Sequence, residues 1–166
     1  KDLLDKAVAK GRMDAAKAES VLALVTATPD YSLVKGADLI VEAVFEDKQV
    51  KAEAIKKAEA FLDPTGTFGS NTSTLPITEL AQNSVRPANF VGIHFFSPVD
   101  RMGLVEIIKG KATTDETVAK AIDYVLKIRK TPIVVNDSRG FYTSRVFSTY
   151  VREGAIMLAE GVKPTI

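Results

Sequence analysis

The chain has 166 residues, which suits one domain with a hydrophobic core or a piece of a larger one. Its 46% hydrophobic and 26% charged residues are typical of a globular protein, and a formal charge of +1 gives no sign of a nucleic-acid or anionic membrane partner. The chain has no cysteine and one histidine, which excludes disulfides, thiolate catalysis and Cys-ligated metals and argues against a His-rich metal site. We therefore expect no bound metal.

The sequence contains no recognisable membrane or secretion segment. No apolar stretch approaches the ~20 residues of a membrane helix. The chain also does not begin with a charged segment followed by an apolar one, which is the pattern of a secretion signal. We therefore expect no membrane insertion and a cytoplasmic location. The first residue is Lys1 rather than Met, which suggests that further sequence, including any signal, precedes it.

Two helices are predicted at the start of the chain, within residues 1–24 and separated near Gly11. Apolar residues recur here at helical spacing, and Asp14 is a suitable cap for the second helix. Residues 25–28 could form a short strand that ends before Pro29.

A strand and a helix are predicted next. Residues 37–46 form an almost continuous apolar run, as expected for a parallel strand that is covered on both faces. Residues 47–62 carry apolar side chains at helical spacing, and the Asp-Pro pair at 63–64 is expected to end this helix. A short strand over 67–70, a polar turn and a brief helix over 75–80 follow.

The segment 89–110 contains the only histidine. Two apolar runs favour strands, and a bend around Asp100 separates them. If the runs pair as an antiparallel ribbon centred near Asp100, His94 and Glu106 lie roughly opposite each other. Their side chains could then touch.

A pair of this kind has a chemical use. An imidazole can take a proton near neutral pH, and a carboxylate on its other ring nitrogen fixes the tautomer and stabilises the imidazolium. A lone histidine beside phenylalanines, such as His94, is also commonly a partly buried structural residue. The spacing to Glu106 favours the catalytic interpretation without deciding between the two.

The rest of the chain continues the alternation of helices and strands. Residues 113–116 have the form of a capping box that opens a helix, residues 131–136 resemble a strand, and a long apolar helix runs from about Gly140 to Glu160. This alternation argues for an α/β fold with a largely parallel sheet.

The carboxyl ends of the strands are the expected ligand site. Ligands of open α/β sheets bind there. The sequence places residues 42–46, 70–73 and 94–97 at such ends. Three loops are therefore expected to converge on one crevice.

Five motifs resemble a known family, the L-3-hydroxyacyl-CoA dehydrogenases. They are VEAVFEDKQVK, GSNTSTLPI, GIHFFSPV, LVEIIKG and the region around RGFYTSR. The similarity is greatest to the dehydrogenase region in the alpha subunit of bacterial multifunctional fatty-acid oxidation enzymes, and it covers essentially the whole chain. It implies a Rossmann-like sheet with mixed strands, a partial NAD-binding domain over residues 1–138, and the start of a helical C-terminal domain over 139–166.

The resemblance also implies roles for single residues. The family's catalytic histidine falls on His94 and its orienting glutamate on Glu106. Ser73 is implied to hydrogen-bond the substrate oxygen close to the nicotinamide. Val44 and Glu46 match positions that contact NAD, with Glu46 as a hydrogen-bond acceptor.

Lys51 also matches a position that contacts NAD, as a hydrogen-bond donor. Without the resemblance each of these polar residues has a simpler interpretation. Glu46 could be the first-turn acid of the following helix, and Lys51 one of several solvated lysines. Ser73 and Asn71 could be ordinary turn or cap residues.

Two positions depart from the family pattern. Ser97 follows the His-Phe-Phe triplet where the family usually has asparagine, and Ser144 stands four residues after Gly140 where asparagine is again usual. In the family both positions contact cofactor or substrate. A serine there removes an amide donor, which bears on substrate preference and leaves the His94 and Glu106 pair untouched.

No G-x-G-x-x-G occurs in the sequence, so the first βαβ unit with its pyrophosphate-binding glycine loop is missing from it. In the family this unit precedes the region matched here. We therefore expect a truncated Rossmann-like sheet, belonging to a larger multifunctional chain or complex, that is poorly active alone.

The function implied by the resemblance is oxidation of L-3-hydroxyacyl-CoA to 3-ketoacyl-CoA with NAD in fatty-acid β-oxidation. The expected partner is an acyl-CoA substrate, and no nucleic acid is expected. Two alternatives stay open: a non-catalytic acyl-CoA or partner-binding module on the same fold, and a related NAD-dependent dehydrogenase of another 3-hydroxy acid.

Overall fold

The computed structural model describes residues 1–165. Its backbone divides into two compact units, Lys1–Leu33 and Val34–Ile166. The first unit holds two helices, α1 (Asp2–Ala9) and α2 (Ala15–Leu22). As predicted, Asp14 caps α2, because its carboxylate accepts a hydrogen bond of 2.7 Å from the backbone N–H of Lys17.

The prediction of a strand over residues 25–28 was wrong. These residues lie in no strand, and a 3₁₀ turn, η1 (Tyr31–Val34), follows them. A strand needs a neighbouring strand to satisfy its backbone N–H and C=O groups. A short apolar segment does not indicate whether such a neighbour exists.

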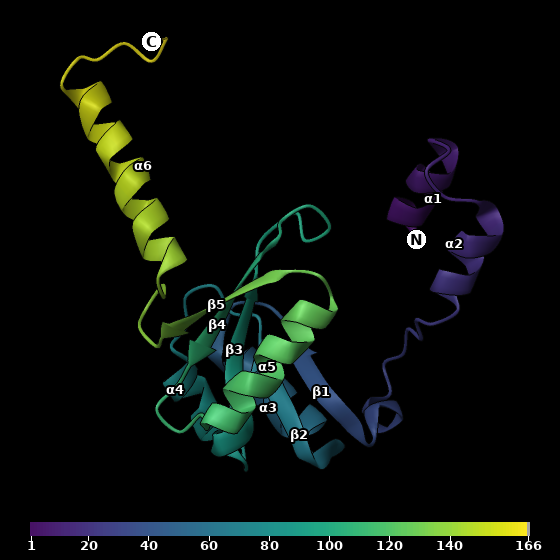
Figure 1. The fold of residues 1–166 in the computed structure, drawn as a ribbon. Coiled ribbons are helices and arrows are strands. Elements are labelled where there is room, and N and C mark those ends of the chain that lie inside the picture. Colours follow the sequence, from purple (N-terminus) through teal and green to yellow (C-terminus); the bar gives the residue numbers. More distant parts are fainter. Residues whose placement is uncertain (166) are drawn as a thin grey trace. The chain divides into compact units, whose positions relative to one another are not determined.

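The second unit is built on a five-stranded mixed sheet in the order β1-β2-β3-β4-β5 (Figure 1). The β3 and β4 strands pair antiparallel, and the other neighbours pair parallel. This confirms the expected α/β fold with mixed strands. The strands are β1 (Ala37–Glu42), β2 (Leu62–Ser70), β3 (Phe90–Phe95), β4 (Leu104–Lys109) and β5 (Thr131–Asn136).

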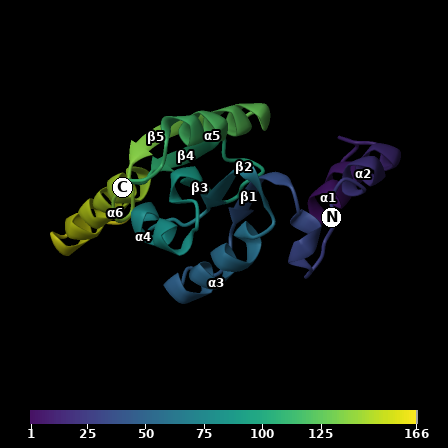
Figure 2. The same ribbon diagram turned by 90° about the horizontal axis from the view of Figure 1, so that it is seen from below.

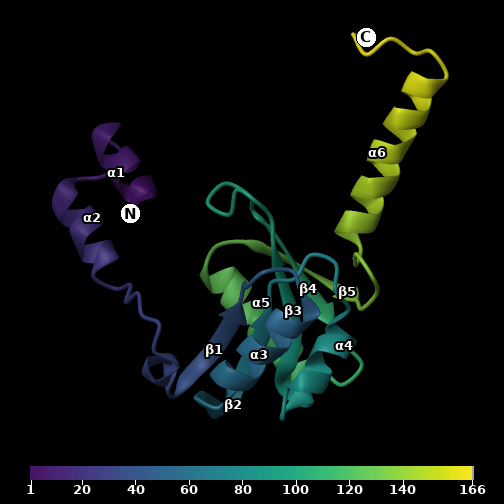
Figure 3. The same cartoon turned by 180° about the vertical axis from the view of Figure 1, so that it is seen from behind.

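Helices cover both faces of this sheet. The α5 helix (Asp115–Lys127) lies on one face, and α3 (Lys48–Glu59) and α4 (Ile77–Leu80) lie on the other (Figure 2). Figure 3 shows α3 in front of the strands from the opposite side. The short turns η2 (Ala81–Asn83) and η3 (Pro87–Asn89) precede β3, and α6 (Thr143–Ala159) follows β5.

Two apolar cores result from the alternation of side chains along the central strands. Ile93 and Ile107 pack with α5 in one core, whereas Phe90 and Ile108 pack with α3 and α4 in the other. By the same alternation, the side chains of residues 94 and 106 belong to the face of Phe90 and Ile108. Burial of the central strands therefore places both ionisable residues on one face of the sheet.

Several predicted boundaries need correction in the first half of the sheet. The β1 strand ends at Glu42 rather than at residue 46, and it is only partly buried because it has a strand neighbour on one side only. The α3 helix ends at Glu59, and Pro64 lies inside β2 instead of stopping the helix. The pairing of β1 with β2 shifts in register at this point, which accommodates a residue without a backbone N–H.

The second half follows the sequence expectations more closely. The bounds of β5 are those predicted. The cap of α5 is Thr114, which accepts a hydrogen bond from the backbone N–H of Thr117, so the helix does not use the expected box between residues 113 and 116. The α6 helix begins at Thr143 rather than near Gly140, because Gly140 and Phe141 have φ angles of 75° and 48° that no right-handed helix contains.

Among residues 1–165, no helix is sufficiently long and apolar to cross a membrane. The same described residues contain no group of three or more His, Cys, Asp or Glu side chains that could hold a metal ion.

Candidate active site

The register of β3 and β4 brings His94 and Glu106 together. The paired residues are symmetric about Asp100, and His94 lies directly opposite Glu106. The imidazole Nδ1 is 3.0 Å from the Glu106 Oε2, and the two residues are 5% and 0% exposed. The predicted contact between these side chains is therefore confirmed.

The Glu106 carboxylate is held by the start of α6 as well as by His94. Its Oε1 accepts hydrogen bonds from the backbone N–H groups of Tyr142 (3.0 Å) and Thr143 (2.9 Å). Its Oε2 accepts a further hydrogen bond of 2.7 Å from the Thr143 hydroxyl. Residues Gly140 and Phe141, in the left-handed region, turn the chain just before these donors. Glu106 thus acts as the cap that α6 lacks in its own sequence.

These contacts decide the charge of the pair. Burial alone raises the pKa of Glu106, but the hydrogen bonds from His94 and Thr143 and from the backbone outweigh burial, so the pKa lies below its ordinary value. An ionised carboxylate only accepts hydrogen bonds, so His94 Nδ1 carries the proton between them. Among the described residues, no hydrogen bond reaches Nε2, and His94 lines the adjoining pocket.

The lowered pKa of Glu106 predicts a pH dependence of stability. The carboxylate contributes stability that is fully present above the pKa it has in the unfolded chain, and this contribution is lost as the pH falls through the lower pKa of the folded chain. We expect the free energy of unfolding, measured with urea, to fall on acidification through this window. The fall should be smaller in Glu106→Gln, and equal slopes for the two proteins would contradict the prediction.

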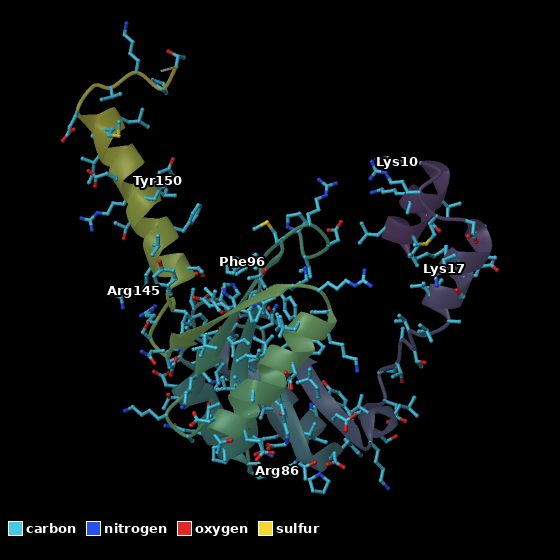
Figure 4. All side chains as sticks on the ribbon, in the orientation of Figure 1. Lys10, Lys17, Arg86, Phe96, Arg145 and Tyr150 are labelled. Atoms are coloured by element: carbon cyan, nitrogen blue, oxygen red, sulfur yellow. The ribbon has the colours of Figure 1, made fainter. Side chains whose placement is uncertain are left out.

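A pocket of about 530 Å³ adjoins His94. Phe96, labelled in Figure 4, follows β3, and its ring centroid lies 4.5 Å from that of His94. The predicted residues Ser97 and Ser144 both line this pocket, although they belong to different segments of the chain. The complete lining is His94, Phe96, Ser97, Met102, Leu104, Thr143, Ser144 and Phe147.

A second group of predicted residues surrounds the ammonium of Lys51. Its Nζ lies 3.1 Å from both carboxylate oxygens of Glu42, 3.3 Å from Glu46 Oε2 and 3.3 Å from the Val44 carbonyl oxygen. Lys51 is 1% exposed, so it is not a solvated surface lysine. The ammonium of Lys51 is therefore engaged by acceptors within the protein.

Glu46 connects this group to the turn that carries Ser73. Its Oε1 accepts hydrogen bonds from the Thr72 hydroxyl (2.5 Å) and from the backbone N–H groups of Ser73 (3.0 Å) and Thr74 (3.3 Å). Burial raises the pKa of Glu46, but the Thr72 hydrogen bond and the Lys51 charge lower it further than burial raises it. The following helix is capped by Asp47, so Glu46 holds the turn rather than the helix.

The ends of three strands converge as predicted. The Asn71 N–H donates to the Glu42 carbonyl at 2.9 Å, and the Asn71 side-chain oxygen accepts from the Phe95 N–H at 2.8 Å. The Ser144 hydroxyl donates to the Ser73 carbonyl at 3.4 Å, which joins the start of α6 to the same turn. Ser73 itself does not line the pocket beside His94.

Sequence reasoning missed three residues of this region. Glu42 is the buried partner of Lys51, Thr143 bonds Glu106, and Phe141 lies with its ring centroid 6.1 Å from that of His94. A carboxylate inside an apolar strand was an available signal for Glu42, because buried charges are usually paired. For Thr143 and Phe141 the only signal was the RGFYTSR motif, which gives no contact by itself.

Comparison with known proteins agrees with a Rossmann-like α/β domain and identifies its family. Residues 1–138 match the model of the NAD-binding domain of 3-hydroxyacyl-CoA dehydrogenase. The chain therefore belongs to the 3-hydroxyacyl-CoA dehydrogenase family, which confirms the resemblance seen in the sequence.

The similar proteins include subunits of a fatty acid oxidation complex and 3-hydroxybutyryl-CoA dehydrogenases. The fatty acid oxidation complex subunit alpha of Shewanella amazonensis is 45% identical over 159 residues, which cover 96% of this chain and 22% of the relative. The structure of (S)-3-hydroxybutyryl-CoA dehydrogenase from Ralstonia eutropha is 33% identical with a TM-score of 0.92, over 98% of this chain and 57% of that one. The 3-hydroxybutyryl-CoA dehydrogenase of Escherichia coli is 30% identical with a TM-score of 0.91, over 98% and 34%. The chain thus spans about 22% of the length of the curated relatives it matches.

Proposed function

We propose that this chain provides the proton-transfer centre for oxidation of L-3-hydroxyacyl-CoA to 3-ketoacyl-CoA with NAD. The observation that supports it most is the buried His94 and Glu106 pair, with a 3.0 Å contact and a pocket beside the imidazole, in a member of this family. The pair has the arrangement that an oriented histidine base requires.

His94 acts in this proposal as the general base. Its Nε2 takes the proton of the substrate 3-hydroxyl as the C3–O bond becomes a carbonyl. The proton held on Nδ1 stays between the ring and Glu106, whose negative charge stabilises the imidazolium that forms. Glu106 orients the base and does not itself contact the substrate.

NAD, when bound, supplies the acceptor for the hydride that leaves C3. The carboxyl ends of β1 and β2 suit its nicotinamide end, since the partly exposed Val44 offers an apolar surface beside the carboxylate of Glu46 and the turn hydroxyl of Ser73. Val44, Glu46, Ser73 and Ser97 would hold this end, and Lys51 would position Glu46. None of the described residues is assigned to the pyrophosphate.

The substrate would enter the pocket beside His94. Ser144, Met102 and Phe147 line this pocket, and Ser144 is proposed to contact the acyl group. Ser73 lies outside the lining but is joined to Ser144 by a hydrogen bond, and it is proposed to bond the 3-oxygen from the edge of the pocket. The serines at 97 and 144 are shorter than asparagine, so they leave more room in this pocket than the usual family residues would.

The wider context is also a proposal. Residues 1–138 would form part of the NAD-binding domain, and residues 139–166 would begin a helical domain that completes the substrate cleft. The similarity to the Shewanella alpha subunits supports a place in a multifunctional enzyme of fatty-acid β-oxidation.

Replacing Glu106 with Gln in the full-length protein tests this proposal. Both carboxylate oxygens of Glu106 accept hydrogen bonds, Oε2 from His94 and Thr143 and Oε1 from the backbone. An amide has only one acceptor oxygen, so its NH₂ must face the donors at one of these two positions. We expect kcat for oxidation of an L-3-hydroxyacyl-CoA to fall by about 10²-fold or more, because the imidazolium loses its counter-charge.

The matched control is Glu79→Gln, which removes an exposed carboxylate that pairs with Lys48 at the surface. This control should keep the wild-type kcat. If Glu106→Gln behaves like Glu79→Gln, the proposed role of the pair is wrong.

A further inference from the structure

Two donors share one oxygen of Glu106. His94 Nδ1 and the Thr143 hydroxyl both bond Oε2, at 3.0 Å and 2.7 Å. The other oxygen, Oε1, is occupied by the backbone N–H groups of Tyr142 and Thr143. The hydroxyl of Thr143 is therefore the one side-chain donor that competes directly with His94 among the described residues.

We propose that Thr143 is a positioning residue that limits the basicity of His94 by sharing the oxygen that supports its imidazolium. A carboxylate oxygen that already accepts a short hydrogen bond has less negative charge to offer a second donor. The imidazolium is therefore less stabilised than it would be beside an unshared oxygen. This keeps the base weak enough to release its proton after the reaction.

The surroundings leave few other charges to set this balance. Among residues 1–165, Glu106 makes an ion pair with His94 alone. Ile133 of β5 is the backbone neighbour of Glu106, and the rings of Phe96 and Phe141 flank the imidazole.

The nearby titratable groups on other elements are engaged elsewhere or exposed. Tyr142 of the turn before α6 is 60% exposed, and Arg145 in the first turn of α6 is also exposed. In the neighbouring turn, Glu46 is paired with Lys51 at 3.3 Å. Removal of the Thr143 hydroxyl therefore takes one hydrogen bond from Glu106 Oε2 and leaves these other groups in place.

The Thr143 hydroxyl belongs to a different element from the two residues whose contact it affects. Thr143 is the first residue of α6, whereas His94 and Glu106 lie on the sheet. Any displacement of the start of α6 therefore alters the donor to Oε2 together with the two N–H groups on Oε1. The strength of the base is linked in this way to the position of α6.

The test uses the fact that His94 is the only histidine of the chain, so that its ring C–H signal can be followed without ambiguity in an NMR titration. Thr143→Val keeps the side-chain shape and removes the hydroxyl, and Thr143→Ala is a second variant without it. In both, we expect the midpoint of the His94 titration to move upward by about 0.5 to 1 pH unit. Thr143→Ser keeps the hydroxyl and should titrate like the wild type.

An unchanged or lower midpoint in Thr143→Val and Thr143→Ala would overturn the inference. The kinetic part rests on the proposed function: the acid limb of kcat/KM for oxidation by the full-length protein should move upward by the same amount. A raised His94 midpoint without a matching change in this limb would support the competition at Oε2 and count against His94 as the base.

Discussion

Replacing His94 with Gln in the full-length protein lowers kcat for NAD-dependent oxidation of an L-3-hydroxyacyl-CoA by about 10²- to 10⁴-fold in our account. The carboxamide of Gln cannot take the hydroxyl proton, whereas its NH₂ can still donate to Glu106 and preserve the anchor of α6. We therefore expect a loss in kcat with little change in KM or in stability. Steady-state kinetics with a reduced-nicotinamide readout measure this directly.

The control for His94→Gln is its unfolding transition in urea, which should lie close to that of the wild type. A variant that folds normally and keeps its kcat would remove His94 from the reaction. That outcome would favour the alternative in which the chain is a non-catalytic acyl-CoA or partner-binding module.

Replacing Lys51 with Met is expected to lower the free energy of unfolding of this chain by about 3–5 kcal/mol. The side chains of Lys51 and Glu42 are 1% and 3% exposed, and the removal of one partner leaves a buried charge without compensation. Met fills a similar volume, so the loss comes mainly from the unpaired Glu42 carboxylate. Urea denaturation followed by circular dichroism measures the change.

Two matched variants isolate this effect. Lys48→Met removes an exposed lysine that pairs with Glu79, and such surface pairs contribute only about 0–1 kcal/mol. The double variant Glu42→Gln/Lys51→Met removes both buried charges and should recover much of the lost stability. If Lys51→Met is no more destabilising than Lys48→Met, the buried pair of Lys51 and Glu42 does not contribute the expected stability.

The sequence was most informative where structure is local. The bend around Asp100 predicted that His94 and Glu106 face each other, because a symmetric ribbon has only one register that aligns its two apolar runs. The cap at Asp14 and the strand over 131–136 were likewise predicted from short patterns. In each example the residues that determine the structure lie within a few positions of one another or share one hairpin.

The sequence was least informative where structure depends on distant contacts. Lys51 resembled a solvated helix lysine, and only the fold places it against Glu42 from a neighbouring strand. Pro64 resembled a helix stop, yet the register shift between β1 and β2 admits it into a strand. The left-handed backbone at Phe141, which directs the first N–H groups of α6 toward Glu106, has no local signal beyond the preceding glycine.

The same distinction applies to the candidate site. The residue types of the base and its support could be predicted, whereas the sharing of Glu106 Oε2 between His94 and Thr143 could not. Thr143 lies 37 positions from Glu106 along the chain and on a different element. Its role follows only from the turn that joins β5 to α6.

The pH dependence of kcat/KM in the wild type and in His94→Gln tests the central role of His94 most directly. We predict that oxidation by the full-length wild type declines at acidic pH, as the imidazole becomes protonated, and that this acid limb is absent from the residual activity of His94→Gln. Persistence of the same acid limb in His94→Gln would show that another group accepts the hydroxyl proton.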